Sequence, residues 1–342
     1  MTRIERVKTA LSGGVPDRIP VIVHNFLMAA QEAGVSMAEF RGSADVIVKT
    51  MTGACIKYDT DGILLDVDTA LLSSACGASV IYPENIAAVT LDKQKRSISQ
   101  IIDDLENVNL LDCDRIKIYL EAINKLSAWC NSNDVFLRAN ADQGPFSLAC
   151  LLVGINDFLM SLMDEDEEEN LMVLMEQTSK IALQMHRLCY EAGGHCTSYG
   201  NSSEGCSVVS PAIFRKFGKP FEIRLHQELA KEGIPTMCHI CGWTDPILPD
   251  LAETGCQAYE FDDRTDIQKA KEVGFGHFVV SGNVDPVLLA NGIPEEVTNV
   301  SRRLLDLYRG QGGLLLGAGC ALSPNTPAEN LHAFVNAAKE YG

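Results

Sequence analysis

The chain has 342 residues, and its 28 Lys and Arg residues against 46 Asp and Glu residues give a formal net charge of −18 at pH 7. Hydrophobic residues make up 46% and charged residues 22% of the sequence, a balance that supports a large buried core and excludes a disordered chain. Because no basic stripe offsets the negative charge, nucleic acid and anionic membranes are poor partners, and small molecules or other proteins are expected instead.

Twelve cysteines are scattered along the chain and do not follow the spacing of a short disulfide-rich domain. The first 14 residues contain no apolar signal-peptide core. The longest apolar runs are far shorter than the roughly 18 residues of a membrane helix. The sequence therefore predicts a cytoplasmic protein with reduced thiols, and the question becomes which thiols take part in chemistry.

Eight short β-rich apolar runs alternate with longer helical patterns along the chain. The predicted strands are residues 19–23, 62–67, 135–139, 195–199, 235–239, 257–261, 277–281 and 313–318. The predicted helices are residues 115–130, 170–192, 211–231, 246–252, 267–271, 295–308 and 327–341. This alternation predicts an α/β fold, a (β/α)8 TIM barrel that forms a single domain over residues 1–342 with an N-terminal helical extension. An open doubly wound sheet is the alternative, but no glycine-rich phosphate loop follows the first strand.

The acidic run at residues 164–169 lies just before one of the long helical patterns. Negative charge complements the positive end of a helix dipole, so these acids are expected to form the exposed first turns of that helix. A metal or partner site is the lesser alternative.

The end of the fifth predicted strand combines two overlapping motifs. Cys238 and Cys241 form a CxxC pair, whereas His239 and Cys241 form a pair two residues apart. Side chains two residues apart on a strand share a face, so His239 and Cys241 point together and Cys238 points away from them. A redox CxxC belongs at a helix N-terminus, which this context does not offer. The strand period therefore favours a metal pair.

Cys320 follows the eighth predicted strand, and in a closed barrel this strand and the fifth end at the same mouth. One imidazole and two thiolates suit a catalytic Zn²⁺ with a replaceable fourth position. Glu260 is the first candidate for that position, and Asp262, on the same face of the sixth strand, is the second. Against this hypothesis, an isolated buried cysteine is usually a small hydrophobe, and an isolated histidine usually packs without a ligand.

Motifs spread nearly end to end then give a resemblance. They are RVKTAL at 6–11, PDRIP at 16–20, GPFSLA at 144–149, Ser210-Pro211, HICG at 239–242, GNVDP at 282–286 and PNTPAENL at 324–331. Through them the chain resembles the uroporphyrinogen decarboxylase superfamily, in the branch of corrinoid-dependent methyltransferases that includes the methylcobamide:coenzyme M methyltransferases. The resemblance implies a (β/α)8 barrel and a catalytic zinc whose His-x-Cys and downstream Cys ligands correspond to His239, Cys241 and Cys320.

The same resemblance implies an activity in one-carbon metabolism. A methyl group would pass from methylcobalamin, held by a transiently bound corrinoid protein, to a thiol such as coenzyme M or to tetrahydrofolate. Five polar residues that end neighbouring strands are candidates for orienting the acceptor or the corrinoid, although turn or cap roles are equally expected. They are Asp142, Asn201, Glu204, Asn283 and Asp285.

Two departures from the superfamily pattern bear on the alternatives. The decarboxylases carry an arginine motif after the first strand that grips tetrapyrrole carboxylates, but residues 23–31 contain no arginine. Without that clamp, a chain of charge −18 would repel such a polyanion, so tetrapyrrole decarboxylation is the less favoured alternative. The turn at 200–204 reads GNSSE where relatives have an Asp-Pro pair. A non-catalytic accessory protein that binds corrinoid or zinc is a further alternative.

Overall fold

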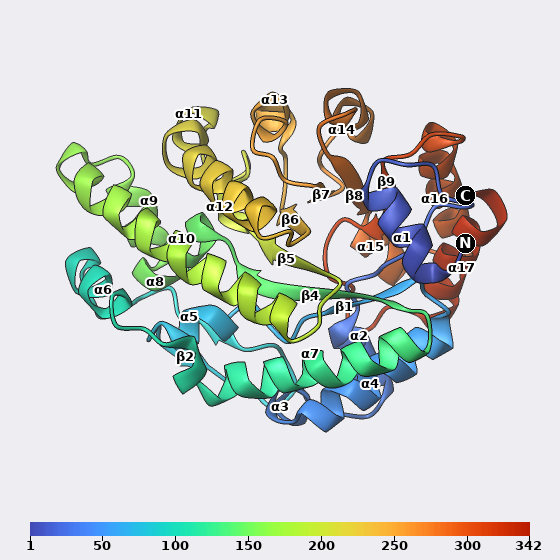
Figure 1. The fold of residues 1–342 in the computed structure, drawn as a ribbon, viewed down its shortest axis with the longest axis horizontal. Helices are drawn as coiled ribbons and strands as arrows, with labels where there is room; N and C mark the ends of the chain where they lie inside the picture. Colours follow the sequence, from blue (N-terminus) through green and yellow to red (C-terminus); the bar gives the residue numbers. More distant parts are fainter.

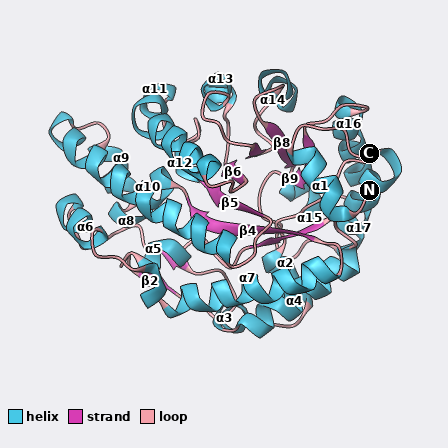
Figure 2. Ribbon diagram, viewed as in Figure 1, coloured by secondary structure: helices cyan, strands magenta, loops and turns pink.

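The computed structural model describes all residues, 1–342, and its centre is a curled parallel sheet surrounded by helices (Figures 1 and 2). The seven strands are hydrogen-bonded in the order β1-β4-β5-β6-β7-β8-β9. Their bounds are β1 (Gly62–Leu65), β4 (Phe136–Gln143), β5 (Cys196–Gly200), β6 (Thr236–Ile240), β7 (Ala258–Phe261), β8 (Val279–Val284) and β9 (Leu314–Ala318). The α/β barrel class predicted from the alternating pattern is confirmed, and seven of the eight predicted strands are present.

The first predicted strand, at residues 19–23, is reduced to one parallel bridge between Val21 and Leu316 of β9. Leu316 N–H donates to Pro20 O at 2.9 Å, and on the other side Asp61 N–H donates to Val21 O at 3.0 Å. This segment therefore lies between the two edge strands and closes the sheet. Pro20 has no N–H to donate, so a regular ladder cannot form across it, which explains the single bridge.

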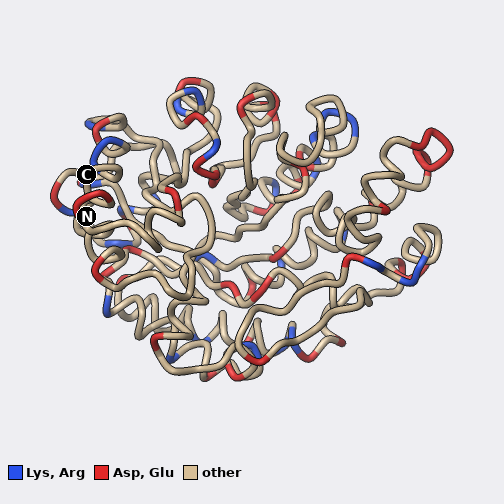
Figure 3. Tube along the Cα trace, turned by 180° about the vertical axis from the view of Figure 1, so that it is seen from behind, with Lys and Arg blue, Asp and Glu red and all other residues tan.

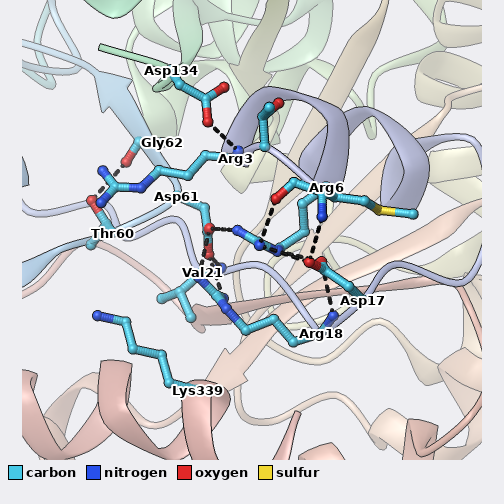
Figure 4. Close-up of polar contacts among 12 residues, drawn as sticks. Arg3, Arg6, Asp17, Arg18, Val21, Thr60, Asp61, Gly62, Asp134 and Lys339 are labelled. Carbon is cyan, nitrogen blue, oxygen red and sulfur yellow. Dashed lines mark hydrogen bonds and ion pairs between the residues drawn. The ribbon is translucent and has the colours of Figure 1, made fainter.

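Asp61, just before β1, fastens this closing segment, as Figure 4 shows. Its side chain is 1% exposed and accepts hydrogen bonds from Arg6 Nη1 at 2.7 Å, from both terminal nitrogens of Arg18 at 2.8 Å, and from the backbone N–H of Val21 at 2.8 Å. Arg6 also pairs with Asp17. The PDRIP motif is thus part of the closure of the barrel.

Helices cover the outside of the sheet (Figure 2). Those foreseen from the sequence are α7 (Asp114–Ser132), α10 (Glu168–Glu191), α13 (Leu248–Leu251), α14 (Ile267–Gly274), α16 (Pro294–Tyr308) and α17 (Ala328–Tyr341). The predicted helix at 211–231 is divided into α11 (Pro211–Ile213), the π-helical turn η4 (Phe214–Gly218) and α12 (Lys219–Lys231). The remaining helices are α1 (Arg3–Leu11), α2 (Phe26–Glu32), α3 (Met37–Gly42), α4 (Ala44–Tyr58), α5 (Leu71–Ala75), α6 (Ile98–Leu105), α8 (Pro145–Val153), α9 (Ile155–Ser161) and α15 (Pro286–Asn291).

A small antiparallel hairpin, β2 (Val80–Ile81) with β3 (Val89–Thr90), lies outside the sheet. Its strands are two residues long, too short to give an alternation that a sequence pattern could reveal. The acidic run at 164–169 forms the turn η2 (Glu165–Glu167) and the start of α10, at the projecting red tip in Figure 3. None of the helices has the length and apolar character needed to cross a membrane.

The inward-facing side chains form two layers with opposite character. The layer near the amino ends of the strands is apolar and packs against Val7, Ala10 and Leu11 of α1; it consists of Ile22, Leu64, Phe136, Cys196, Met237, Ala258, Val279 and Leu315. Side chains alternate along a strand, so positions two residues further on face the same interior. These are His24, Asp66, Arg138, Ser198, His239, Glu260, Ser281 and Gly317. The polar layer therefore lies toward the carboxyl ends of the strands.

We predict that Asp61→Ala lowers the free energy of unfolding by about 3–5 kcal/mol, because it leaves two guanidinium groups and one backbone N–H without their buried acceptor. Urea denaturation followed by circular dichroism measures the change. As a control, Asp45→Ala removes an exposed partner of Lys125, for which a loss of about 0–1 kcal/mol is expected. Equal losses in the two variants would contradict the assigned role of Asp61.

Candidate metal centre at the carboxyl ends of the strands

β6 presents His239 to the barrel interior and Cys238 to the opposite side. The parallel register pairs His239 with Gly200 of β5 and with Glu260 of β7. Cys241 follows the strand by one residue, and its Sγ atom lies 3.0 Å from Nε2 of His239. Gly242 next adopts a φ of 78°, and a Cβ at this position would lie 2.4 Å from Ser207 Oγ. The chain can therefore turn here only with glycine after Cys241.

Cys320 joins this pair from the end of β9. The ligand atoms of His239, Cys241 and Cys320 all lie within 4.8 Å of one another, and each of the three residues is partly exposed. The backbone at Gly319 approaches the loop after β7 so closely that a Cβ would lie 2.7 Å from Asp263 N. One imidazole and two sulfurs in reach of solvent match the donor set of a zinc site that keeps a position for a fourth ligand.

In the metal-free protein, the pKa values of His239 and Cys320 are raised and that of Cys241 is lowered. The pKa of Cys241 is lowered, chiefly by its hydrogen bond with Cys320, and the same bond with burial raises the pKa of Cys320 to about 12. Burial by itself lowers the pKa of His239, but the hydrogen bond with Cys320 and the charge of Glu260 outweigh it and raise the pKa to about 9. Ser202 Oγ lies 3.2 Å from Cys241 Sγ and helps to stabilise the thiolate. A metal ion must therefore displace protons to bind.

Glu260 approaches the imidazole of His239 from the side away from the sulfurs. Its Oε1 atom is 3.4 Å from Nδ1, and the backbone O of Glu260 is 3.1 Å from the same nitrogen. The carboxylate also forms a buried ion pair with Arg138 of β4. Burial alone would raise the pKa of Glu260, yet the charges of Arg138 and His239 lower it to about 2. Glu260 is thus an anion that fixes Nδ1 as a donor and leaves Nε2 for a ligand bond.

Asp262, the second candidate for the fourth position, lies beside the turn after β6. Its Oδ2 atom accepts from Gly242 N–H at 2.8 Å, and its Oδ1 atom accepts from Arg264 N–H at 3.1 Å. The structure therefore gives each of the two acids another contact: Glu260 holds His239, and Asp262 holds the backbone next to Cys241.

Four of the five weaker candidates form hydrogen bonds that hold neighbouring segments of the chain in place. Asp142 accepts from Leu72 N–H and Gln143 Nε2, and burial with the charge of Asp66 raises its pKa to about 8. Asn201 accepts from Ser147 N–H.

The other two such candidates lie further round the barrel. Asn283 donates to the backbone O atoms of Asp262 and Thr265, and Asp285 caps α15 by accepting from Val287 N–H. Glu204 differs from all four, because both of its buried carboxylate oxygens lack a hydrogen-bond partner.

Sequence reasoning missed Arg138, Ser202, His24 and Asp66. His24 Nε2 and Asp66 Oδ2 lie 2.9 Å apart, and Asp66 also accepts from Val67 N–H. Arg138 could have been identified from its position in the sequence, because a charged residue between apolar residues of a central strand has to face either a partner or a cavity. Ser202 lies in an irregular turn, and no sequence pattern indicated its contact with Cys241.

Comparison with known proteins gives a consistent set of relatives. The family model described as uroporphyrinogen decarboxylase (URO-D) matches residues 2–341. The methylcobamide:CoM methyltransferase MtbA of Methanosarcina acetivorans is 24% identical over 348 aligned positions that cover 98% of this chain and 97% of the relative. A uroporphyrinogen decarboxylase of Thermus thermophilus is 31% identical, but over 49% of this chain and 48% of its own length. The solved structure of a methyltransferase from Methanosarcina mazei superposes with a TM-score of 0.86 at 22% identity, covering 100% of this chain and 99% of the other.

We predict that Glu260→Gln lowers the pKa of His239 in the metal-free protein from about 9, because the carboxylate charge that favours the imidazolium is lost. Titration of the imidazole by NMR, with the signal assigned by its loss in His239→Gln, measures the shift. Glu253→Gln, which removes an exposed carboxylate paired with Lys219, is the control and should leave the titration unchanged. An unaltered His239 titration in Glu260→Gln would contradict the role assigned to Glu260.

Proposed function

The chain belongs to the uroporphyrinogen decarboxylase family, and from that premise we propose that it transfers a methyl group from a methylated corrinoid to a thiol at a zinc centre. Relatives that align over nearly its whole length are methyltransferases, and the chain is an enzyme of that class. The observation that carries the proposal is the convergence of His239, Cys241 and Cys320 within 4.8 Å. The names of the same relatives support methylcobamide as the donor and coenzyme M as the acceptor.

The residues of the centre fit the proposed zinc ion. Nε2 of His239 and the two sulfurs would hold Zn²⁺, and Glu260 would keep the imidazole oriented through Nδ1. Zn²⁺ held there supplies a Lewis acid that lowers the pKa of a thiol acceptor, so that the acceptor is a thiolate at neutral pH. Of the two acids considered for the fourth position, Glu260 contacts the imidazole at Nδ1 and Asp262 contacts Gly242 N–H, so either would have to give up that contact to bind the ion.

In the transfer itself, a lone pair of the acceptor sulfur forms the new S–CH3 bond. The Co–C bond of the methylcorrinoid breaks, and its electron pair stays on cobalt to give the Co(I) corrinoid. The proton of the thiol leaves before the attack. The side chains of this protein hold the sulfur at the mouth, while a separate corrinoid protein would present the methyl group at the carboxyl ends of the strands, the end at which barrel enzymes place their chemistry.

Arginine pairing argues against a tetrapyrrole substrate. Arg138 is paired with Glu260 and Arg115 with Asp68, so neither guanidinium is free to bind an added carboxylate. Asp66, Asp68 and Asp142 are buried at the ends of β1 and β4, and these acids offer no positive charge to an added carboxylate. These contacts favour methyl transfer over decarboxylation.

We predict that Cys241→Ala loses one equivalent of bound zinc and at least about 100-fold in the rate of methyl transfer from free methylcobalamin to coenzyme M. Metal analysis of the purified protein and the cobalamin absorbance change measure the two effects. Cys113→Ala removes a similarly half-buried thiol that is not part of the centre, and it should retain both zinc and activity. Full activity in zinc-depleted Cys241→Ala would refute the mechanism.

Zinc binding should also depend on pH in a defined direction. At pH 7.5 His239 and Cys320 both carry protons, since their pKa values are raised to about 9 and about 12, so binding at this centre releases at least these two protons. Affinity therefore rises as pH increases from 7 toward 9, where His239 becomes neutral. Titration of metal-free protein with Zn²⁺ in a weakly buffered solution containing a pH dye counts the protons. The count should fall by about one as the pH is raised past 9, where His239 has already lost its proton, and a count that stays constant would contradict this protonation pattern.

A further inference from the structure

A second group of potential metal ligands lies on the outer side of β6, behind His239. It consists of Glu204 in the turn η3 (Ser202–Glu204), Glu222 in α12 and Cys238 in β6, and their ligand atoms lie within 4.8 Å of one another. The exposed fractions of the three residues are 0%, 1% and 0%, so the group is closed to solvent. It is separate from the centre at the mouth because Cys238 and His239 point to opposite sides of the strand.

The available hydrogen-bond donors in this group all go to Glu222. Its Oε1 atom accepts from Tyr199 Oη and Asn201 Nδ2, both at 3.1 Å, and from the thiol of Cys238 at 3.6 Å. Its Oε2 atom accepts from Tyr259 Oη at 3.2 Å. The strand register explains the arrangement, since Tyr199, Cys238 and Tyr259 occupy paired positions on β5, β6 and β7. Both carboxylate oxygens of Glu222 therefore have hydrogen-bond donors from neighbouring side chains.

Glu204 receives none of these hydrogen bonds. Both of its carboxylate oxygens are buried and have no partner, and the backbone of Gly218 lies so close that a Cβ there would be 2.8 Å from Oε2. No lysine or arginine forms an ion pair with either glutamate. The nearby His226 is neutral, because burial lowers its pKa even though the charge of Glu222 opposes this.

Two buried carboxyl groups this close need a positive charge between them. Burial and the charge of Glu222 raise the pKa of Glu204 well above its usual range. Without a metal, the positive charge that the group needs is therefore supplied by a proton. One proton shared between Glu204 and Glu222 offsets only one of the two carboxylate charges, whereas a divalent ion offsets both. A metal ion can contact both oxygens of Glu204 at once and so satisfies the whole group.

We propose that Glu204, Glu222 and Cys238 form a second, buried metal site that holds a divalent ion of the zinc class. Two carboxylates and one sulfur are three ligands of the kinds that Zn²⁺ accepts, and the second oxygen of Glu204 can add a further contact. Magnesium and calcium require six or more oxygen ligands, which this group does not supply. The protons of Glu204 and of the Cys238 thiol are released when these groups bind the ion. The divalent ion offsets two of the three negative charges, and the third lies among the donors of Tyr199, Asn201 and Tyr259.

A metal at this site would hold the turn that carries Ser202 in place. Glu204 lies two residues after Ser202, whose Oγ atom is 3.2 Å from Cys241 Sγ at the mouth. A metal that joins η3 to α12 and β6 fixes the turn that carries Ser202. Its ligands come from three elements, and all its ligand positions can be filled by the protein, as in structural zinc sites.

The test removes the first centre and counts the zinc that remains in the full-length chain. In protein produced with added zinc, we expect about two zinc ions per wild-type chain, about one in Cys241→Ala/Cys320→Ala, and none when Glu204→Gln is added to that double variant. If the first centre holds no zinc, the double variant contains as much zinc as the wild-type chain, so failure of the function proposed above is distinguishable from failure of the second site. A double variant without stoichiometric zinc, or one that keeps it after Glu204→Gln, would overturn the second site.

If Glu204→Gln disturbs folding, a spectroscopic measurement on the double variant still tests the second site. Cobalt bound to the double variant should show a near-ultraviolet thiolate charge-transfer band, which Cys238→Ala abolishes. Cys189→Ala, which removes an equally buried thiol outside the group, should leave the band in place. Absence of the band in the folded double variant, or its survival in Cys238→Ala, would overturn the proposal.

Discussion

The buried ion pair between Arg138 and Glu260 sets the geometry of the barrel interior. The two residues come from β4 and β7, which are separated by two strands in the sheet, so the pair spans the interior and not one edge of it. An ion pair in such a place adds little net stability, because desolvation of both charges offsets their attraction. Its effect is on orientation: Glu260, held by Arg138, faces Nδ1 of His239, and Nε2 is thereby directed at Cys241 and Cys320.

One end of the barrel contains the contacts that stabilise the fold, and the other end contains the side chains that can take part in chemistry. At the amino ends of the strands, an apolar layer packs on α1, and the contacts of Asp61 close the sheet through the PDRIP segment. At the carboxyl ends, the same alternation brings in charged and sulfur-containing side chains. Motifs that resembled a family signature therefore have different physical meanings: Asp17 and Arg18 maintain closure, whereas His239, Cys241 and Cys320 provide donor atoms.

The features that were predictable from the sequence are those with a regular period. Seven strands followed from short apolar runs, and the opposite directions of Cys238 and His239 followed from the two-residue repeat. The segment at 19–23 was read as a full strand because its apolar residues outweighed the missing N–H of Pro20. Arg138 was overlooked because its neighbours are apolar, and the contacts of Glu204 and Asn283 depend on loop conformations that leave no periodic trace. Cys320 was found only by assuming a closed barrel, since it lies about 80 residues from its partners.

The register of β6 decides what each of its side chains can do. Pairing of His239 with Gly200 and Glu260 places an imidazole between a residue without a side chain and a carboxylate, and pairing of Cys238 with Tyr199 and Tyr259 places a thiol among phenols. A shift by one residue would exchange the two faces and put Cys238 in the mouth and His239 among the hydroxyls. Met237, which faces the apolar inner layer, and Ile240, which packs in the outer core, oppose that shift because both would lose their apolar surroundings. The chemistry at the mouth therefore depends on hydrophobic packing elsewhere on the same strand.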